Sequence, residues 1–303
     1  MDGRLKMRKG MLIWLLLGGG AFVLLAVTLT AIVLTFSGDE GTEFAFSDRI
    51  QVVDIDGELV QSRPIIDQLK RYEESNSVKA ILLNIDSPGG GVAVSQEIYT
   101  EIKRLREKKD KIVVAYLSST GASGAYYVSV AANKIVANPG TIVGSIGVIA
   151  EWVNYADLMQ WAKLKDIVFK TGEFKDTGSA SRALTDNEKK YFQGLIDDMY
   201  VQFVEAVASG RKLDLQDVRA MADGRVFTGR NAKERKLIDE IGNFQDAVDV
   251  TAKLAGISGK PRLVRLTRQR VTLLDVLTTD LSRLVPFSGQ SMKSQIKFQY
   301  LWK

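Results

Sequence analysis

A serine flanked by small residues follows a short apolar run near the middle of the chain. Residues 112–117 read Ile-Val-Val-Ala-Tyr-Leu, and the motif Gly-Ala-Ser-Gly-Ala at 121–125 places Ser123 at the start of an apolar helical stretch. Small neighbours leave a serine hydroxyl sterically open, and the N–H of Gly124 can help to hold an oxyanion at a helix start. Because serine is also common as a simple helix cap, this pattern predicts either a nucleophile or a cap.

A second glycine-rich junction, Asp-Ser-Pro-Gly-Gly-Gly at 86–91, follows the apolar residues 81–85 and precedes a helical pattern. Consecutive glycines expose backbone N–H groups with no side chains in the way, which suits a phosphate or an oxyanion. The junction contains neither the GxxxxGKS/T pattern nor a GxGxxG pattern that opens a helix, so it does not indicate a nucleotide-phosphate loop. An oxyanion site and a simple tight turn remain as the two interpretations.

The chain contains no histidine and no cysteine. Ser-His-Asp triads, Cys-His pairs, HExxH zinc sites and thiolate zinc clusters are therefore excluded, which leaves Lys, Tyr, Asp and Glu as general bases. A lysine has a pKa of about 10.4 in water, and this value can fall toward neutrality when the amine is desolvated. These residue types favour a lysine base for a serine nucleophile. The downstream candidates include Lys134, Lys163, Lys165, Lys170 and Lys175.

Four motifs follow one another along the chain. They are Asp-Ser-Pro-Gly-Gly at 86–90, Gly-Ala-Ser-Gly-Ala-Tyr-Tyr at 121–127, Gly-Ser-Ile-Gly-Val at 144–148 and Gly-Glu-Phe-Lys-Asp at 172–176. In that order they resemble the motif series of the signal peptide peptidase A family, in its short form with one catalytic unit. Four ordered motifs are much more specific than any one of them, and the resemblance covers residues 49–257.

The resemblance implies an α/β fold of the Clp-protease/crotonase type and a Ser-Lys dyad that needs no metal or cofactor. By position in the motifs, Ser123 is the nucleophile, Lys175 is the general base, and the N–H groups of Gly90 and Gly124 are the oxyanion donors. Ala125 stands where the family usually has glycine. Family members of the short form assemble into a ring in which neighbouring subunits complete each active site, so a homo-oligomer is also implied.

Short apolar runs alternate with helical patterns through the body of the chain. Residues 50–55, 80–85 and 112–117 are apolar almost throughout, which is typical of strands buried on both faces of a parallel sheet. The sequence therefore predicts repeated βαβ units in one peptidase domain over residues 49–258. Further expected elements are strands at 134–137, 146–151 and 167–170, the last shortly before Lys175, and a helix that begins near Thr185 with a Thr-x-x-Glu capping signature.

The first 48 residues carry a membrane-targeting pattern. Residues 11–36 are an uncharged stretch long enough to cross a hydrocarbon core of about 30 Å, and this length favours a single transmembrane signal anchor over a cleavable signal peptide. Basic residues dominate the preceding segment 1–10, and acidic residues lie in the linker 37–48, so we expect the N-terminus in the cytoplasm. The peptidase domain is then expected on the extracytoplasmic side of the cytoplasmic membrane.

The formal net charge of +5 is concentrated at the two ends of the chain. The first nine residues contribute +3 and residues 259–303 contribute +7, which leaves −5 for the body and argues against nucleic-acid binding. We expect the basic C-terminal tail, residues 259–303, to be disordered or loosely packed. Its aromatic end could also form a strand added to a neighbour or an arm that contacts lipid headgroups.

These patterns together predict a membrane-anchored serine endopeptidase that degrades cleaved signal peptides and other membrane-associated peptides through an acyl-enzyme. The expected partners are such peptides, the membrane and further copies of the chain. Two alternatives remain open. A crotonase-like acyl-CoA enzyme could use Glu97 or Glu151 as its base on the same fold, and an inactive scaffold of that fold could bind peptides at the membrane.

Overall fold

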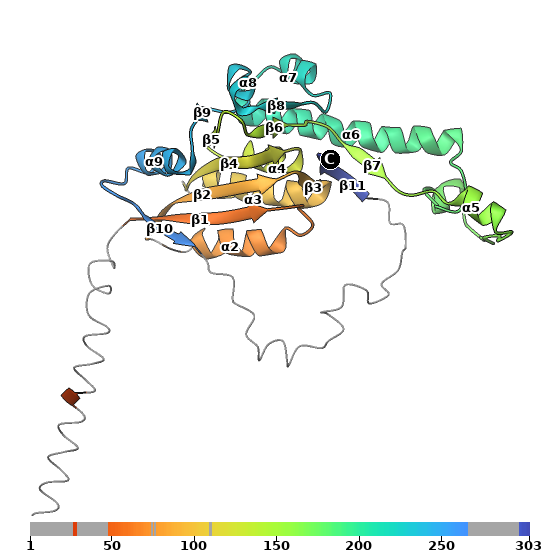
Figure 1. Cartoon of the computed structure of the whole chain (residues 1–303), viewed down its shortest axis with the longest axis horizontal. Helices are drawn as coiled ribbons and strands as arrows, with labels where there is room; N and C mark the ends of the chain where they lie inside the picture. The colour runs from red at the N-terminus through yellow and green to blue at the C-terminus, as the bar shows by residue number, and fades with distance from the viewer. Residues whose placement is uncertain (1–26, 29–47, 74, 76, 109–110, 266–296) are drawn as a thin grey trace, which may run out of the picture. The chain divides into compact units, whose positions relative to one another are not determined.

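The computed structural model in Figure 1 describes residues 27–28, 48–73, 75, 77–108, 111–265 and 297–303. The described residues from Asp48 onward belong to one compact unit. The predicted N-terminal segment, signal anchor and linker (1–10, 11–36 and 37–48) lie outside the described residues except for Val27, Thr28 and Asp48. Within the described ranges, no helix combines the length and the apolar character that crossing a bilayer requires.

The centre of the compact unit is a sheet in the order β10-β1-β2-β4-β5-β9, to which β6 and β8 are added beside β4. Its strands are β1 (Arg49–Asp56), β2 (Val78–Ser87), β4 (Ile112–Ala122), β5 (Lys134–Ala137), β6 (Ile142–Gly144), β8 (Val226–Thr228), β9 (Glu240–Ile241) and β10 (Arg262–Arg265). The β1, β2, β4 and β5 strands run parallel to one another. This arrangement confirms the predicted parallel sheet.

Both faces of this sheet are buried, because successive side chains of a strand point to opposite sides. In β2, Ile81, Leu83 and Ile85 belong to one core cluster, whereas Ala80 and Leu82 belong to another. The covering helices are α2 (Arg63–Glu73), α3 (Val92–Lys108), α4 (Gly124–Ser129) and α9 (Phe244–Leu254). The α9 helix packs on the second cluster and the other three pack on the first. Cover on both sides explains why the strand sequences are almost continuously apolar.

In the C-terminal half of the unit, helices and short strands alternate along the chain (Figure 1). The long helix α6 (Asp186–Arg211) begins where the sequence predicts: the hydroxyl of Thr185 accepts the N–H of Glu188, and the carboxylate of Glu188 accepts the N–H of Thr185. This capping box satisfies two backbone donors at a helix start. The shorter helices α7 (Leu215–Met221) and α8 (Gly229–Glu234) come next along the chain.

A small antiparallel sheet joins three segments that are far apart in the sequence. Its strands are β3 (Gly89–Gly91), β11 (Lys297–Leu301) and β7 (Ile149–Glu151), with β11 in the middle, beside β3 in Figure 1. In addition, β10 pairs with β1. The expectation of a loosely packed tail is therefore wrong for β10 and β11. The reason is that β11 gains backbone partners on both sides and buries an aromatic side chain, Tyr300, completely.

Residues 152–182, which we call the arm, come after β7 and contain the short helix α5 (Ala156–Trp161) and the single-turn helix η1 (Glu173–Asp176). Residues 167–170 are exposed and form no strand, so the predicted strand before Lys175 is wrong. Phe169, for example, is 96% exposed. The strand was predicted because Ile167, Val168 and Phe169 are apolar. An apolar pattern identifies side chains that could be buried, but it does not show whether another part of the chain covers them.

Candidate active site

Ser123 occupies the junction between the end of β4 and the start of α4. Its backbone has φ 53° and ψ −119°, in the left-handed φ range that non-glycine residues rarely adopt. Two hydrogen bonds hold this conformation: the N–H of Ser123 donates to Gly144 O at 2.7 Å, and the N–H of Tyr127 donates to Ser123 O at 2.8 Å. Because the Ser123 side chain makes no capping hydrogen bond, the helix-cap interpretation is wrong.

The glycine-rich strand β3 approaches Ser123 closely. A methyl group on Gly89 would stand 3.1 Å from Ser123 Cβ and 2.6 Å from Gly124 N, and one on Gly124 would stand 3.1 Å from Gly90 N. Gly89 also has φ 100°, which L side chains rarely adopt. These residues form a strand and not a simple tight turn. The fold therefore brings Ser123, Gly90 and Gly124 into one small region.

A cavity of about 640 Å³ opens beside Ser123. Its lining comes mainly from the segment that begins at Ser145, from α6 and from the C-terminal residues 301–303. Ser145, like Ser123, is buried and has a positive φ, here 51°. Ser123 itself is only 1% exposed in this arrangement. The end of the chain is thus part of the wall of the candidate active site.

Lys175 lies on η1 of the arm and does not line this cavity. The η1 turn is tied to the first turn of α6, where the Asn187 side chain donates to Glu173 Oε1 at 3.1 Å. Helix α4, which begins at Gly124 directly after Ser123, instead contacts α6 near Phe203. These two points are about 24 Å apart along α6, and the α6 residues that line the cavity beside Ser123 lie between them, from Gln193 to Tyr200. Lys175 is exposed and has no hydrogen bond or ion pair to any residue in the described ranges. Within one chain, the predicted base is therefore not beside the predicted nucleophile.

A charge network holds the arm against the start of α6. The Arg182 guanidinium pairs with the carboxylates of Asp176 and Glu188, and Lys170 pairs with Asp176 at 2.5 Å. The Glu188 side chain is buried, and hydrogen bonds from Arg182 lower its pKa to about 2. Hydrogen bonds from Arg182 and Lys170 also lower the pKa of Asp176. These contacts fix the position of η1, and with it Lys175, relative to α6.

Replacing Glu188 with glutamine is expected to lower the free energy of unfolding by about 2 kcal/mol at neutral pH, because Arg182 loses a buried anionic partner. The pKa of Glu188 in the fold lies below the value of about 4.3 for free glutamate. Ionised Glu188 therefore stabilises the fold above that pH, and this contribution disappears as the pH falls toward 2. Chemical denaturation of both proteins between pH 7 and pH 2 measures the difference.

The matched control for this variant is Glu234→Gln, at an exposed position near the end of α8. We expect the control to unfold like the wild type at every pH, since exposed charges contribute little. A stability loss in Glu188→Gln that stayed constant down to pH 2 would contradict the assigned role of the charge.

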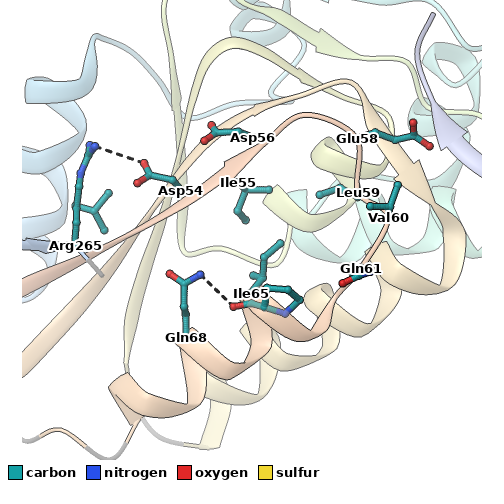
Figure 2. Close-up of a pocket in the computed structure, with 12 residues that line it drawn as sticks. Asp54, Ile55, Asp56, Glu58, Leu59, Val60, Gln61, Ile65, Gln68 and Arg265 are labelled. Carbon is teal, nitrogen blue, oxygen red and sulfur yellow. Dashed lines mark hydrogen bonds and ion pairs between the residues drawn. The ribbon is translucent and has the colours of Figure 1, made fainter. Parts of the chain in front are cut away.

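A second cavity, of about 720 Å³, lies between β1 and α2, as Figure 2 shows. Its lining carries Asp54, Asp56 and Glu58, and Asp54 forms an ion pair with Arg265 at 3.7 Å. Asp54 also accepts a hydrogen bond of 2.7 Å from the side chain of Asn84. Since none of the predicted site residues lines this cavity, it is separate from the candidate active site.

The two carboxylates considered for an acyl-CoA enzyme have partners elsewhere. Glu97 accepts the hydroxyl of Ser62, and Glu151 pairs with Lys303. Neither of them lines the cavity beside Ser123. The acyl-CoA alternative therefore lacks its expected bases at this site.

The sequence analysis did not predict that the C-terminal residues are part of the candidate active site. Residues 301–303 line the cavity, and Tyr300 is fully buried. The aromatic residues Phe298, Tyr300 and Trp302 alternate with other residues, which is a strand pattern that could have predicted β11. The choice of β3 and β7 as its neighbours could not be predicted, because no periodicity identifies a partner strand.

Two family models match this chain. The model of peptidase family S49 matches residues 105–258, and the model of Clp protease matches residues 42–139. The two matches overlap around β4 and Ser123. The second match supports the Clp-protease-like α/β fold that the four motifs imply.

Several curated proteins are similar to this chain. One from Synechocystis sp. described as a protease is 42% identical over 211 residues, which are 69% of this chain and 75% of that protein. One from Enterococcus faecium described as signal peptide peptidase SppA is 39% identical over 61% of this chain and 54% of that protein. The chloroplastic serine protease SPPA of Arabidopsis thaliana is 33% identical over 73% of this chain and 33% of its own length.

This chain thus spans less than two thirds of the length of the Enterococcus faecium and Arabidopsis thaliana relatives. With its strained serine at the strand–helix junction, the chain belongs to peptidase family S49 and is a serine peptidase.

Proposed function

We propose that this chain is a membrane-anchored serine endopeptidase that degrades cleaved signal peptides and other membrane-associated peptides. The observation that carries the proposal is the geometry at Ser123, where an extended segment lies paired between β3 and β7 beside the serine. A groove that binds a peptide as an added strand contacts its backbone and therefore accepts many sequences. The description of one relative as a signal peptide peptidase supports the substrate class.

In the proposed reaction, the Ser123 hydroxyl oxygen attacks the carbonyl carbon of a peptide bond while the neutral amine of Lys175 accepts the hydroxyl proton. The N–H groups of Gly90 and Gly124 donate to the oxyanion that forms. The protonated amine then passes its proton to the leaving amine, and water hydrolyses the acyl-enzyme. The close approach of Gly90, Gly124 and Ser123 supports the roles of these three residues.

In this proposal, Lys175 comes from a neighbouring subunit of a ring. A lysine that acts as a base near neutral pH must be desolvated, and Lys175 is exposed within one chain. The arm that carries Lys175 also exposes large apolar side chains, namely Val153, Leu158, Trp161, Leu164, Ile167 and Phe169. Exposed apolar surface of this kind is typical of a surface that a partner buries. A second subunit packed on the arm would exclude water from Lys175. It would also place its own Ser123 beside that lysine.

The proposed location is the cytoplasmic membrane, with residues 11–36 as a single-pass anchor and the peptidase unit on the extracytoplasmic side. The basis is the uncharged length of that segment and the excess of basic residues before it. At this location the groove would meet signal peptides after their removal from exported proteins.

The proposal predicts that a membrane-impermeant, serine-directed fluorophosphonate labels this protein in intact spheroplasts. We expect labelling at Ser123, because a serine activated by a base and an oxyanion site reacts with such probes. Gel fluorescence and peptide mass mapping measure it, and the Ser123→Ala variant is the control. Labelling only after lysis would contradict the topology. A protein that stays unlabelled after lysis would instead support the inactive peptide-binding scaffold.

A further inference from the structure

A fully buried serine lies at the end of β2, directly before the glycine-rich strand β3. This residue, Ser87, is 0% exposed. Its hydroxyl donates to Gly57 O at 2.6 Å and accepts the N–H of Gly89 at 3.1 Å. A serine hydroxyl has one proton and two lone pairs, so both hydrogen bonds can form at once. The Ser87 side chain therefore joins the segment after β1 to the first residue of β3, and no step of the proposed reaction uses it.

The segment after β1 is also hydrogen-bonded along one edge of β3. The N–H of Leu59 donates to Gly89 O at 2.8 Å, and the N–H of Gly91 donates to Leu59 O at 2.9 Å. Leu59 and Gly90 form a parallel bridge. A methyl group on Gly90 would stand 2.3 Å from Leu59 O, so the two backbones approach too closely for a side chain. This edge of β3 is thus fixed by backbone contacts and by the Ser87 hydroxyl.

These contacts determine which way the N–H of Gly90 points. Successive N–H groups of a strand point to opposite edges. The N–H groups of Gly89 and Gly91 are both bonded at the edge described above, so the N–H of Gly90 points to the opposite edge, which pairs with β11. The carbonyl of Gly89 shares a planar trans peptide group with the N–H of Gly90. Because Leu59 binds that carbonyl, this second contact favours the same orientation.

Glycine backbones need such contacts to keep one orientation. Gly89 has φ 100°, a region that glycine enters without a steric cost, and no side chain restricts rotation on either side of it. Ser87 holds the N–H of Gly89, while Leu59 holds its carbonyl. The second hydrogen bond of Ser87, to Gly57, also fixes the segment that carries Leu59. Removal of one hydroxyl would therefore loosen both constraints on the peptide group between residues 89 and 90.

We propose that Ser87 is a positioning residue whose hydroxyl holds the N–H of Gly90 toward the oxyanion that forms at Ser123. This inference rests on the proposed function, because Gly90 has this role only if Ser123 attacks a carbonyl. A methyl group on Gly124, the other predicted donor, would stand 3.1 Å from Gly90 N. The two donors are therefore close neighbours, and rotation of the Gly90 peptide group would change their spacing. Misplacement of a catalytic group by about 1 Å can lower a rate by about a hundredfold.

The test compares Ser87→Ala with the wild type, both as full-length proteins, in hydrolysis of a fluorogenic peptide. We expect kcat to fall by about ten- to a hundredfold and KM to stay near the wild-type value, because the oxyanion is present in the transition state and not in the bound substrate. Inhibition by a peptide aldehyde, which forms a tetrahedral adduct at Ser123, should weaken by a similar factor. A smaller fraction of folded enzyme would lower kcat but would leave the inhibition constant of the aldehyde unchanged. The inhibition constant therefore separates positioning from stability.

The matched control is Thr251→Val in α9, on the other face of the central sheet. Thr251 is also fully buried, and its hydroxyl donates to Ala247 O at 2.6 Å. We expect this variant to lose stability but to keep the wild-type kcat and aldehyde inhibition, since the lost hydrogen bond is within α9. If circular dichroism shows that Ser87→Ala does not fold, Ser87→Cys keeps the side-chain shape with a weaker donor and acceptor. It should weaken aldehyde inhibition severalfold.

Unchanged aldehyde inhibition in a folded Ser87 variant would overturn the inference, as would a higher KM with an unchanged kcat. The Ser123→Ala variant, assayed with the same peptide, separates the inference from the proposed function. Hydrolysis that disappears in Ser123→Ala but stays normal in Ser87→Ala rejects the inference and leaves the proposed function standing.

A wild type that cleaves no peptide but is labelled at Ser123 by a fluorophosphonate rejects the proposed function alone. The labelling rate then replaces kcat as the measured quantity, because the oxygen of the phosphonyl group occupies the same oxyanion site. Slower labelling of Ser87→Ala supports the inference, and equal labelling rejects it. A folded wild type that neither cleaves peptides nor reacts with the probe rejects both.

Discussion

Replacing Ser123 with alanine is expected to lower the rate of peptide hydrolysis by a factor of about 10⁴ or more, since loss of a nucleophile removes the acyl-enzyme route. The variant should fold normally. Alanine removes one oxygen, and the backbone hydrogen bonds that hold the junction, to Gly144 and from Tyr127, do not involve the side chain. Hydrolysis of a fluorogenic peptide and thermal unfolding, measured on the same preparation, test both statements.

The matched control is Ser119→Ala, which removes a hydroxyl from an exposed position of the same strand. We expect it to keep wild-type activity. If Ser123→Ala retained more than about a hundredth of the wild-type rate while folded, Ser123 would not be the nucleophile. The scaffold and acyl-CoA alternatives would then have to be reconsidered.

Replacing Lys175 with alanine is also expected to abolish hydrolysis, but activity should return when this variant is co-expressed with Ser123→Ala. If a dyad is completed between subunits, a site is intact whenever Ser123 of one variant meets Lys175 of the other. Random mixing in a ring predicts that about a quarter of the sites are intact. Co-purification through two different tags, followed by the peptide assay, measures the recovered fraction.

The control for the lysine is Lys165→Ala, which removes an exposed amine from the same arm. We expect this variant to remain active, because it leaves Lys175 and the charge network at Arg182 in place. Mixed oligomers that form and stay inactive would contradict completion of the site by a neighbour. A dyad formed within one chain after movement of the arm would then be the remaining arrangement for Lys175.

Much of the fold follows from local sequence. Strands that are apolar on both faces require cover on both sides, so the runs at 80–85 and 112–117 predict a parallel sheet with helices around it. Thr185 and Glu188 predict the start of α6, because the capping box uses neighbouring residues only. The segment 167–170 shows the limit of such patterns. Its apolar residues resemble a buried strand, yet within the described part of this chain nothing covers them.

The candidate site was predictable to different degrees. The glycines at 89, 90 and 124 could be expected to lie near Ser123, because the carboxyl ends of adjacent parallel strands meet at one edge of a sheet. Chemistry alone indicated a lysine base, but the choice of Lys175 among the lysines depended on the resemblance to a family. The structure places this lysine on the exposed arm and not at the serine.

The sequence by itself determined which catalytic groups are available. It supplies a serine between small residues, glycines whose backbone N–H groups no side chain shields, and no histidine to act as a base. These properties are local, since they depend on residue types and on neighbours a few positions away. Only the tertiary structure decided that Lys175 lies outside the cavity beside Ser123 and that the Tyr300 carbonyl lies near the Ser123 junction. Both results depend on contacts between residues far apart in the chain. Backbone pairing of β11 with β3 and β7 uses groups that every residue carries, so no residue pattern specifies it.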